Sequence, residues 1–544
     1  MTDATGGPGL PAARVMTDPA AGTTMRALSP RPSAFVLVLA ILAGGPRVAA
    51  ASDAPGCETL APRACLDAAI VAMGGRARLE SVSHIEWQGL GHTLLMEQSY
   101  RQEPFLASYQ RYHEWIDFAG ARVRSEQTLT WPQAGGTSPT DTASTLVMTP
   151  QGGDYRSGGH SQPLPGAARV VLDERLQQEP MRLLLTADHA ARLRYARPQM
   201  LHGTLHTSLA FDVDGRTWQL LLDPVTHLPD ALERTRTFDD FWYAWGDVNE
   251  QIDYDNWILV DGIHYPSTRI EERNGKVWRS TQVLTVTIDG ATPAGTFDTT
   301  HARPAGELTG SRWERPFDGR HPVALASGVD LYPGAWNTAL IKQDDGIVVL
   351  ESPISPVYTA GLLDLARQRY PDLPVKAVLT TSDSWPHAAG VREAVARHLP
   401  VYALDLNLPL LQRLVEAPHR LRPDRLQRQP AAPQWHAVAG RTVIGTGPRR
   451  IELYPLRGAD TGRQYMVYFP ASKLLYASDT LVLDPTSGAL YQPELMAEVV
   501  QAVERAHLDV RTVFAMHQGP TPWKQVLALL KAASQGPVED GRAG

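Results

Sequence analysis

The feature that most constrains this chain is a change of hydrophobic pattern near residue 320. Residues 83–288 contain short runs in which apolar and polar residues alternate, such as SHIEWQGLGHT, ASYQRYHEWIDF and STQVLTVTI. Alternation between turn signals predicts half-buried antiparallel strands. After His321, strand-like runs are interspersed with amphipathic helical segments, a mixture that predicts helices covering packed sheets. In a chain of 544 residues, the two patterns indicate an α+β protein with two folded domains.

The boundaries of these domains follow from composition. We expect a β-rich domain over residues 52–288 that starts with a helix, and a second domain over 321–535. Residues 289–320 are rich in Gly, Pro and Thr and are predicted to be a linker, while 536–544 read as a disordered tail. Within the first domain, one helix is expected around Met181–Tyr195, and the Gly- and Ser-rich residues 133–166 are expected to form a long loop.

The first 51 residues resemble a targeting segment. Met25, Arg26 and Arg31 supply a basic start, residues 34–43 are apolar, and Ala49–Ala51 offer a small-residue cleavage site. This pattern predicts a signal peptide over about residues 25–51 and a periplasmic or secreted protein; the alternative is an uncleaved anchor helix. No other stretch is long and apolar enough to cross a bilayer, so no transmembrane span is expected in the mature chain.

Charge and cysteine content narrow the range of partners. The formal net charge is -7, and acidic and basic residues are mixed along the chain. Without a basic stripe, nucleic acid is not expected as a partner. The two cysteines, Cys57 and Cys65, lie close together after the expected cleavage site, which favours a local disulfide in an exported chain; two free thiols are the alternative.

Five segments of residues 321–535 resemble, in order, the metallo-β-lactamase superfamily. They are the DGIVVLESP hairpin that follows Asn337, the phrase AVLTTSDSWPHAAGVRE, then RGADTG, LLYASDTL and VFAMHQGP. The resemblance implies an αβ/βα sandwich whose metal ligands lie at the ends of separate strands. Fold alone does not define a substrate, because this scaffold supports many reactions.

The family's metal motif is carried over only in part. His387 stands at the last position of the H-x-H-x-D-H motif, Asp479 at the bridging aspartate and His517 at the final histidine. Other positions have changed residue type: Ser382, Ser384 and Pro386 replace His, His and Asp, Asp460 replaces the third His, and Glu351 replaces an Asp. The resemblance therefore implies a partly dismantled site.

Two imidazoles and a carboxylate are enough for one metal ion. His387, Asp479 and His517 form a three-ligand set that suits Zn, with Fe(II) or Mn(II) as alternatives. A metal-bound hydroxide would then attack an ester or amide, because the ion lowers the pKa of its water to about 7. Asp383 or Asp460 is the expected proton acceptor. Alternatively, Asp479 bonds only a backbone amide, and residues 382–384 act only as helix caps.

A second interpretation is a binding protein without catalysis. The phrases DPVTHLPDALE and NWILVDGIHYPSTRIEE resemble LolA-like lipoprotein carriers, in which a half-barrel cups a hydrophobic ligand. The chain would then carry an apolar envelope molecule, and the second domain would be a degenerate enzyme; a first domain with a filled core is a further alternative. Under either interpretation the partner is a small or lipid-like molecule. Trp336, Trp385 and Trp523 flank the expected mouth, as pocket walls or as packing residues.

Overall fold

The structure is a computed structural model that describes residues 56–57, 59–96, 105–130, 141–164, 168–300, 313–484 and 487–535. The chain divides into Met1–Ser52 and Asp53–Gly544, and everything described below belongs to the second unit. The predicted signal peptide and the C-terminal tail lie outside the described residues. Within the described ranges, no helix combines the length and the apolar character that crossing a membrane requires.

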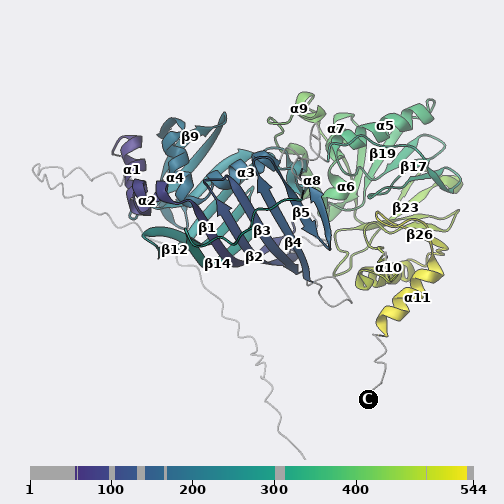
Figure 1. Cartoon of the computed structure of the whole chain (residues 1–544). Coiled ribbons are helices and arrows are strands. Elements are labelled where there is room, and N and C mark those ends of the chain that lie inside the picture. Colours follow the sequence, from purple (N-terminus) through teal and green to yellow (C-terminus); the bar gives the residue numbers. More distant parts are fainter. Residues whose placement is uncertain are drawn as a thin grey trace, which may run out of the picture. The chain divides into compact units, whose positions relative to one another are not determined.

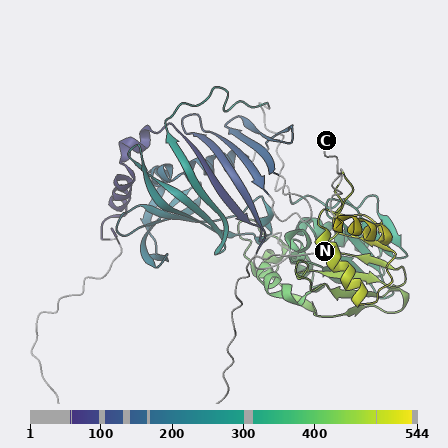
Figure 2. The ribbon, with the colours of Figure 1, turned by 90° about the horizontal axis from the view of Figure 1, so that it is seen from below.

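The first domain is built on one long antiparallel sheet with the order β6-β5-β4-β3-β2-β1-β14-β13-β12-β11-β10-β9-β7, and β8 pairs with β9. The first strand of this sheet in the sequence, β1, lies beside the last, β14 (Figure 2). In their register, Ile85 lies opposite Ile288. The strands are β1 His84–Leu94, β2 Ala107–Asp117, β3 Arg122–Thr130, β4 Asp141–Thr149, β5 Gly152–Ser157, β6 His160–Pro163, β7 Ala191–Tyr195, β8 Gln199–Leu201, β9 Thr204–Val213, β10 Arg216–Leu222, β11 Pro229–Arg236, β12 Val248–Val260, β13 Ile263–Arg273 and β14 Lys276–Ile288.

Four helices fill one face of this sheet. They are α1 Pro62–Met73, α2 Arg76–Ser81, α3 Ala168–Gln177 and α4 Pro180–His189. Leu66 and Ile70 of α1 and Leu183 of α4 join a single core with strand residues such as Phe211. The predicted alternation is confirmed, because buried and more exposed residues alternate along most of β2. The predicted disulfide between Cys57 and Cys65 is present and joins the start of the domain to α1.

The prediction of a long loop over residues 133–166 is wrong. Outside 131–140 and 165–166, which are not described, this segment forms β4, β5 and β6. Gly153 lies in β5, where glycine is required because a side chain would lie 2.0 Å from the carbonyl oxygen of Val147. The Ser and Thr content was misleading, since threonine is β-branched and fits a pleated sheet well. The helix expected around Met181–Tyr195 is likewise shorter, since α4 ends at His189 and Ala191–Tyr195 is a strand.

The second domain contains two sheets. The first has the order β15-β16-β17-β18-β19-β20-β21 and is parallel from β18 onward. The second has the order β22-β23-β24-β25-β26-β27, with β25 and β26 parallel. The strands are β15 Val323–Ala326, β16 Val329–Tyr332, β17 Thr338–Lys342, β18 Ile347–Leu350, β19 Val375–Thr380, β20 Pro400–Leu404, β21 Gln434–Val438, β22 Thr442–Ile444, β23 Ile451–Pro455, β24 Tyr465–Phe469, β25 Leu474–Tyr476, β26 Thr512–Phe514 and β27 Thr521–Pro522.

Helices cover the outer faces of these two sheets (Figure 1). The helices are α5 Pro356–Arg369, α6 Trp385–Ala388, α7 Val391–Ala396, α8 Leu408–Glu416, α9 Arg425–Arg428, α10 Pro493–Arg505 and α11 Trp523–Ser534. Three separate cores define four layers: one between α5–α8 and the first sheet, one between the two sheets, and one between the second sheet and α10–α11. The predicted mixture of helices and packed sheets in this part of the chain is therefore observed.

Candidate metal centre

The three predicted ligands come together at one edge of the second domain. His387 lies in α6, which follows β19, whereas Asp479 follows β25 and His517 follows β26. Nε2 of His387 is 3.8 Å from Oδ2 of Asp479, and Nε2 of His517 is 3.1 Å from Oδ1 of the same carboxylate. Asp479 thus lies between the two imidazoles. This convergence arises because the segments that follow β19 of the first sheet and β25 and β26 of the second meet at one edge of the packed sheets.

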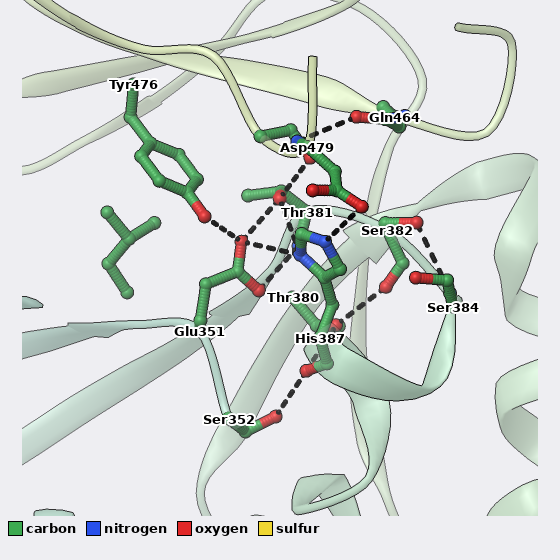
Figure 3. A network of polar contacts seen from close by, with 12 residues as sticks. Glu351, Ser352, Thr380, Thr381, Ser382, Ser384, His387, Gln464, Tyr476 and Asp479 are labelled. Carbon is green, nitrogen blue, oxygen red and sulfur yellow. Dashed lines mark hydrogen bonds and ion pairs between the residues drawn. The ribbon is translucent and has the colours of Figure 1, made fainter. Parts of the chain in front are cut away.

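His387 is held from its other side by Glu351 (Figure 3). Nδ1 of this fully buried ring lies 3.1 Å from Oε1 of Glu351, which directly follows β18. The same carboxylate accepts hydrogen bonds from the hydroxyl groups of Thr381 and of Tyr476, the latter at 2.9 Å. Burial opposes a charged ring, but Glu351 and Asp479 on its two sides raise the pKa of His387 to about 10.

His517 and Asp479 are fixed by the backbone and by a side-chain amide. Nδ1 of His517 donates to the carbonyl oxygen of Ala335 at 2.8 Å, and the backbone N–H of Asp479 donates to Gln464 at 3.0 Å. Burial disfavours the charged carboxylate, but the two imidazoles hold the pKa of Asp479 well below its usual range. In turn, Asp479 outweighs the burial of His517 and raises the pKa of that ring.

This donor set fits a divalent metal ion. In both histidines an acceptor occupies Nδ1, which leaves Nε2 directed toward one carboxylate, as in many metal-binding histidines. The buried Nε2 of His387 has no hydrogen-bond partner among the described residues, because 3.8 Å to Asp479 is too long for one. A shared ion would supply the missing partner.

The ligand atoms of His387, Asp479 and His517 do not all lie within 4.8 Å of one another. Among the described residues, one group of three metal-ligand side chains has its ligand atoms within 4.8 Å of one another, and it is His206, Asp223 and Asp230 of the first domain. A shared ion at the predicted site therefore requires adjustment of Asp479 or His517, whose side chains are 21% and 31% exposed.

The other predicted site residues have different surroundings. Asp383 forms an ion pair with Arg463, and both side chains are buried. Asp460 lies in a turn, and its own backbone N–H donates a hydrogen bond to the carboxylate of Glu498 at 3.2 Å. The Oγ of Ser382 accepts a hydrogen bond from the backbone N–H of Ser384 at 3.2 Å, as expected of a residue that stabilises the turn before a helix.

The sequence did not indicate the polar network around Glu351. The hydroxyl groups of Thr381 and Ser478 form a hydrogen bond with each other at 2.6 Å. The hydroxyl of Thr381 also lies 3.4 Å from Nδ1 of His387. Glu351 and Ser478 both have positive φ values, +69° and +55°. Non-glycine residues rarely take this conformation, and it often marks functional sites. No signal in the sequence predicts these backbone angles.

Aromatic side chains surround the segment that carries His387. The rings of Phe241, Trp313 and Trp336 lie 4.7, 4.8 and 5.2 Å from that of Trp385, and Trp336 lies 6.4 Å from His517. We call these four residues the aromatic cluster. Trp336 and Trp385 were predicted to flank the mouth, but Phe241 and Trp313 come from the preceding domain and linker and were missed.

Trp523 belongs elsewhere: it packs against the core beneath α10 and α11.

No protein-family model matches this sequence, and no curated protein matches it. Several solved metallo-β-lactamases are similar to part of the chain. The enzyme from Erythrobacter litoralis, solved with β-mercaptoethanol in its active site, is 18% identical over 39% of this chain and 96% of its own, with a TM-score of 0.31. The Pontibacter korlensis enzyme is 16% identical over 39% and 98%, also with a TM-score of 0.31. The enzyme from Hirschia baltica is 14% identical over 40% and 98%, with the same TM-score.

Proposed function

We propose that the second domain is a hydrolase that uses one divalent metal ion, Zn in the first instance, held by His387, Asp479 and His517. The observation that carries this proposal is the orientation of the two imidazoles. Each has its Nδ1 engaged by an oxygen and its Nε2 directed at Asp479. When bound, the ion would act as a Lewis acid and lower the pKa of a water ligand to about 7.

The residues around the ion have separate tasks in this proposal. Glu351 orients His387 by accepting a hydrogen bond from its Nδ1, while the aromatic cluster shields the site from water on one side. The proton acceptor would be Asp460 or Asp383, of which Asp383 is paired with Arg463. The substrate is a small or lipid-like ester or amide, and the protein acts in the periplasm or outside the cell.

Metal analysis of the unmodified chain and of three variants tests the proposal. After reconstitution with Zn²⁺, Fe²⁺ or Mn²⁺, we expect an equivalent of metal that His387→Gln and His517→Gln remove. His206→Gln is the matched control, since it disrupts the other group of ligands. A folded protein that binds no stoichiometric metal, or that loses metal only with His206→Gln, contradicts the proposal. His517→Gln covers the case in which the fully buried His387 cannot be replaced without unfolding.

A second candidate function is binding without catalysis. The ion pair of Asp383 with Arg463 favours it, because a buried guanidinium–carboxylate pair occupies part of the segment that in the resembled family supplies ligands. An apolar molecule retained in native mass spectrometry after gentle purification would support this function. Loss of a measured hydrolysis in His387→Ala would exclude it.

A further inference from the structure

A large cavity lies beside the segment that carries His387. Its volume is about 760 Å³, within the range of small-molecule sites, and its walls include Asp383, Trp385 and Ala388. The opposite wall comes from the first domain, through Trp242 of the 3-10 helix η1 (Phe241–Trp245) and the end of β13. These two parts are joined by Asp247, whose carboxylate accepts hydrogen bonds from the backbone amides of Arg420 and Leu421 at 2.8 and 3.0 Å.

The cavity has an excess of positive charge. Its two acidic residues are both engaged, Asp247 with backbone amides and Asp383 with Arg463. By contrast, the side chains of Lys276, Arg413 and Arg420 line the cavity without a carboxylate partner among the described residues. The charge of this surface is therefore complementary to that of an anionic group.

Two buried donors support the same conclusion. Trp242 and Trp385 are each 4% exposed, and their indole N–H groups have no hydrogen-bond partner in the described part of the chain. A buried tryptophan normally pairs this group. The remaining wall includes Met96, Phe105 and Leu410, which offer apolar contact.

From these features we infer that the cavity binds an amphipathic anion, a molecule with one carboxylate or phosphate group on an aliphatic chain. The cationic residues attract the head group, an indole N–H donates to it, and the apolar wall accepts the chain. This site does not depend on a metal ion at His387. Its position beside residues 383–388 means that an occupant contacts the segment on which the proposed centre is built.

Calorimetric titration of the full chain tests the inference, with dodecanoate and dodecyl phosphate below their micellar concentrations. We expect one molecule bound per chain, and the tighter of the two identifies the head group. Lys276→Glu/Arg413→Glu should weaken binding at least tenfold, and Leu410→Trp should do so by filling the apolar wall. Lys524→Glu/Lys531→Glu is the matched control: it makes the same charge change on α11, which is not part of the lining, and should leave affinity unchanged.

Three results would overturn the inference: no saturable binding, equal affinity for neutral dodecyl maltoside, or no effect of the cavity variants. Because the titration is made without added metal, failure of the metal proposal does not affect its outcome.

Discussion

Glu351 is the residue on which the candidate centre most depends. It is fully buried, has a φ of +69°, and is contacted by the imidazole of His387 and by two hydroxyl groups. A buried carboxylate in such a network contributes little net stability but is costly to disrupt, since its partners lose their acceptor. It also fixes which nitrogen of His387 faces the site.

Replacing Glu351 therefore has two expected effects. Glu351→Gln removes the charge that faces His387, and should lower the free energy of unfolding by about 3–5 kcal/mol. It should also weaken metal binding by about 10–100-fold, because the imidazole is no longer held in place. Chemical denaturation and metal titration measure the two effects.

Tyr476→Phe is the control for this change. It removes one hydrogen bond to Glu351, keeps the charge, and should cost only about 1 kcal/mol. Equal stability of Glu351→Gln and the unmodified chain would show that the carboxylate is not needed for the network.

At the scale of elements, the loop after β26 is held by the segment before β17. Asn337 donates from Nδ2 to the carbonyl oxygens of Ala515 and Gln518 at 2.9 and 3.3 Å, and its backbone N–H donates to Met516 at 2.8 Å. These contacts place His517, since Ala335 of the same segment accepts from its ring.

Asn337→Ala should release this loop. The buried carbonyl group of Ala515 and the part-buried one of Gln518 would lose their donor, so we expect a loss of about 1–3 kcal/mol in stability and a weaker metal site. Thermal unfolding and metal titration provide the measurements. Gln434→Ala, which removes a single bond to His398 at an exposed site, is the control and should be nearly neutral. An unchanged metal affinity in Asn337→Ala would show that the contacts of Asn337 with this loop do not contribute to the metal site.

In the first domain, α4 starts at a buried ion pair. Glu179 is fully buried and accepts two hydrogen bonds from Arg269 at 2.8 and 2.7 Å and one from Arg175 at 2.9 Å. Breaking this set by Glu179→Gln should cost about 3–5 kcal/mol in a denaturation experiment. Asp173→Asn, in an exposed pair with Arg169, should cost about 0–0.5 kcal/mol. Similar losses of stability in both variants would show that the buried ion pair of Glu179 matters no more than the exposed pair of Asp173.

The sequence could predict those helices and strands whose pattern of apolar and polar residues is visible within one short segment. The mixture of strands and amphipathic helices after residue 321 followed from periodicity and from the family resemblance, and the structure has two sheets covered by helices there. The strands β4–β6 were missed because Ser, Thr and Gly are common to loops and to edge strands. The partners of the site, including Arg463 and Phe241, could not be predicted, because their contacts depend on segments far apart in sequence.

At the scale of the whole molecule, His419 connects the two domains. Its ring lies against Gly246, where a side chain would come within 2.4 Å of the ring, and the neighbouring Pro418 accepts a hydrogen bond from Asp247 at 2.8 Å. Burial, assisted by the positive charge of Arg392, lowers the pKa of His419 to about 4. The folded chain therefore keeps this imidazole neutral.

This shift predicts a loss of stability in acid. An unfolded histidine takes up a proton below its pKa of about 6.5, whereas the folded one does so only near pH 4, so protons favour the unfolded chain between these values. Relative to pH 7.5, we expect His419 to reduce the free energy of unfolding by about 2 kcal/mol at pH 5. Denaturation at both pH values, compared with His419→Gln, measures the difference. An identical pH dependence in the variant would assign the effect to other groups.

The separate origins of the three candidate ligands have a consequence for how the site can fail. His387 is supplied by the chain of the first sheet, whereas Asp479 and His517 are supplied by the second, and the two sets are held in register by the core between the sheets and by polar contacts such as that of Thr381 with Ser478. Slippage of one half of the sandwich against the other would separate the ligands while every strand stayed hydrogen-bonded. Metal occupancy of the centre would therefore measure how well the two halves of the sandwich are packed together. Loosening of the core between the sheets should abolish metal binding before secondary structure is lost.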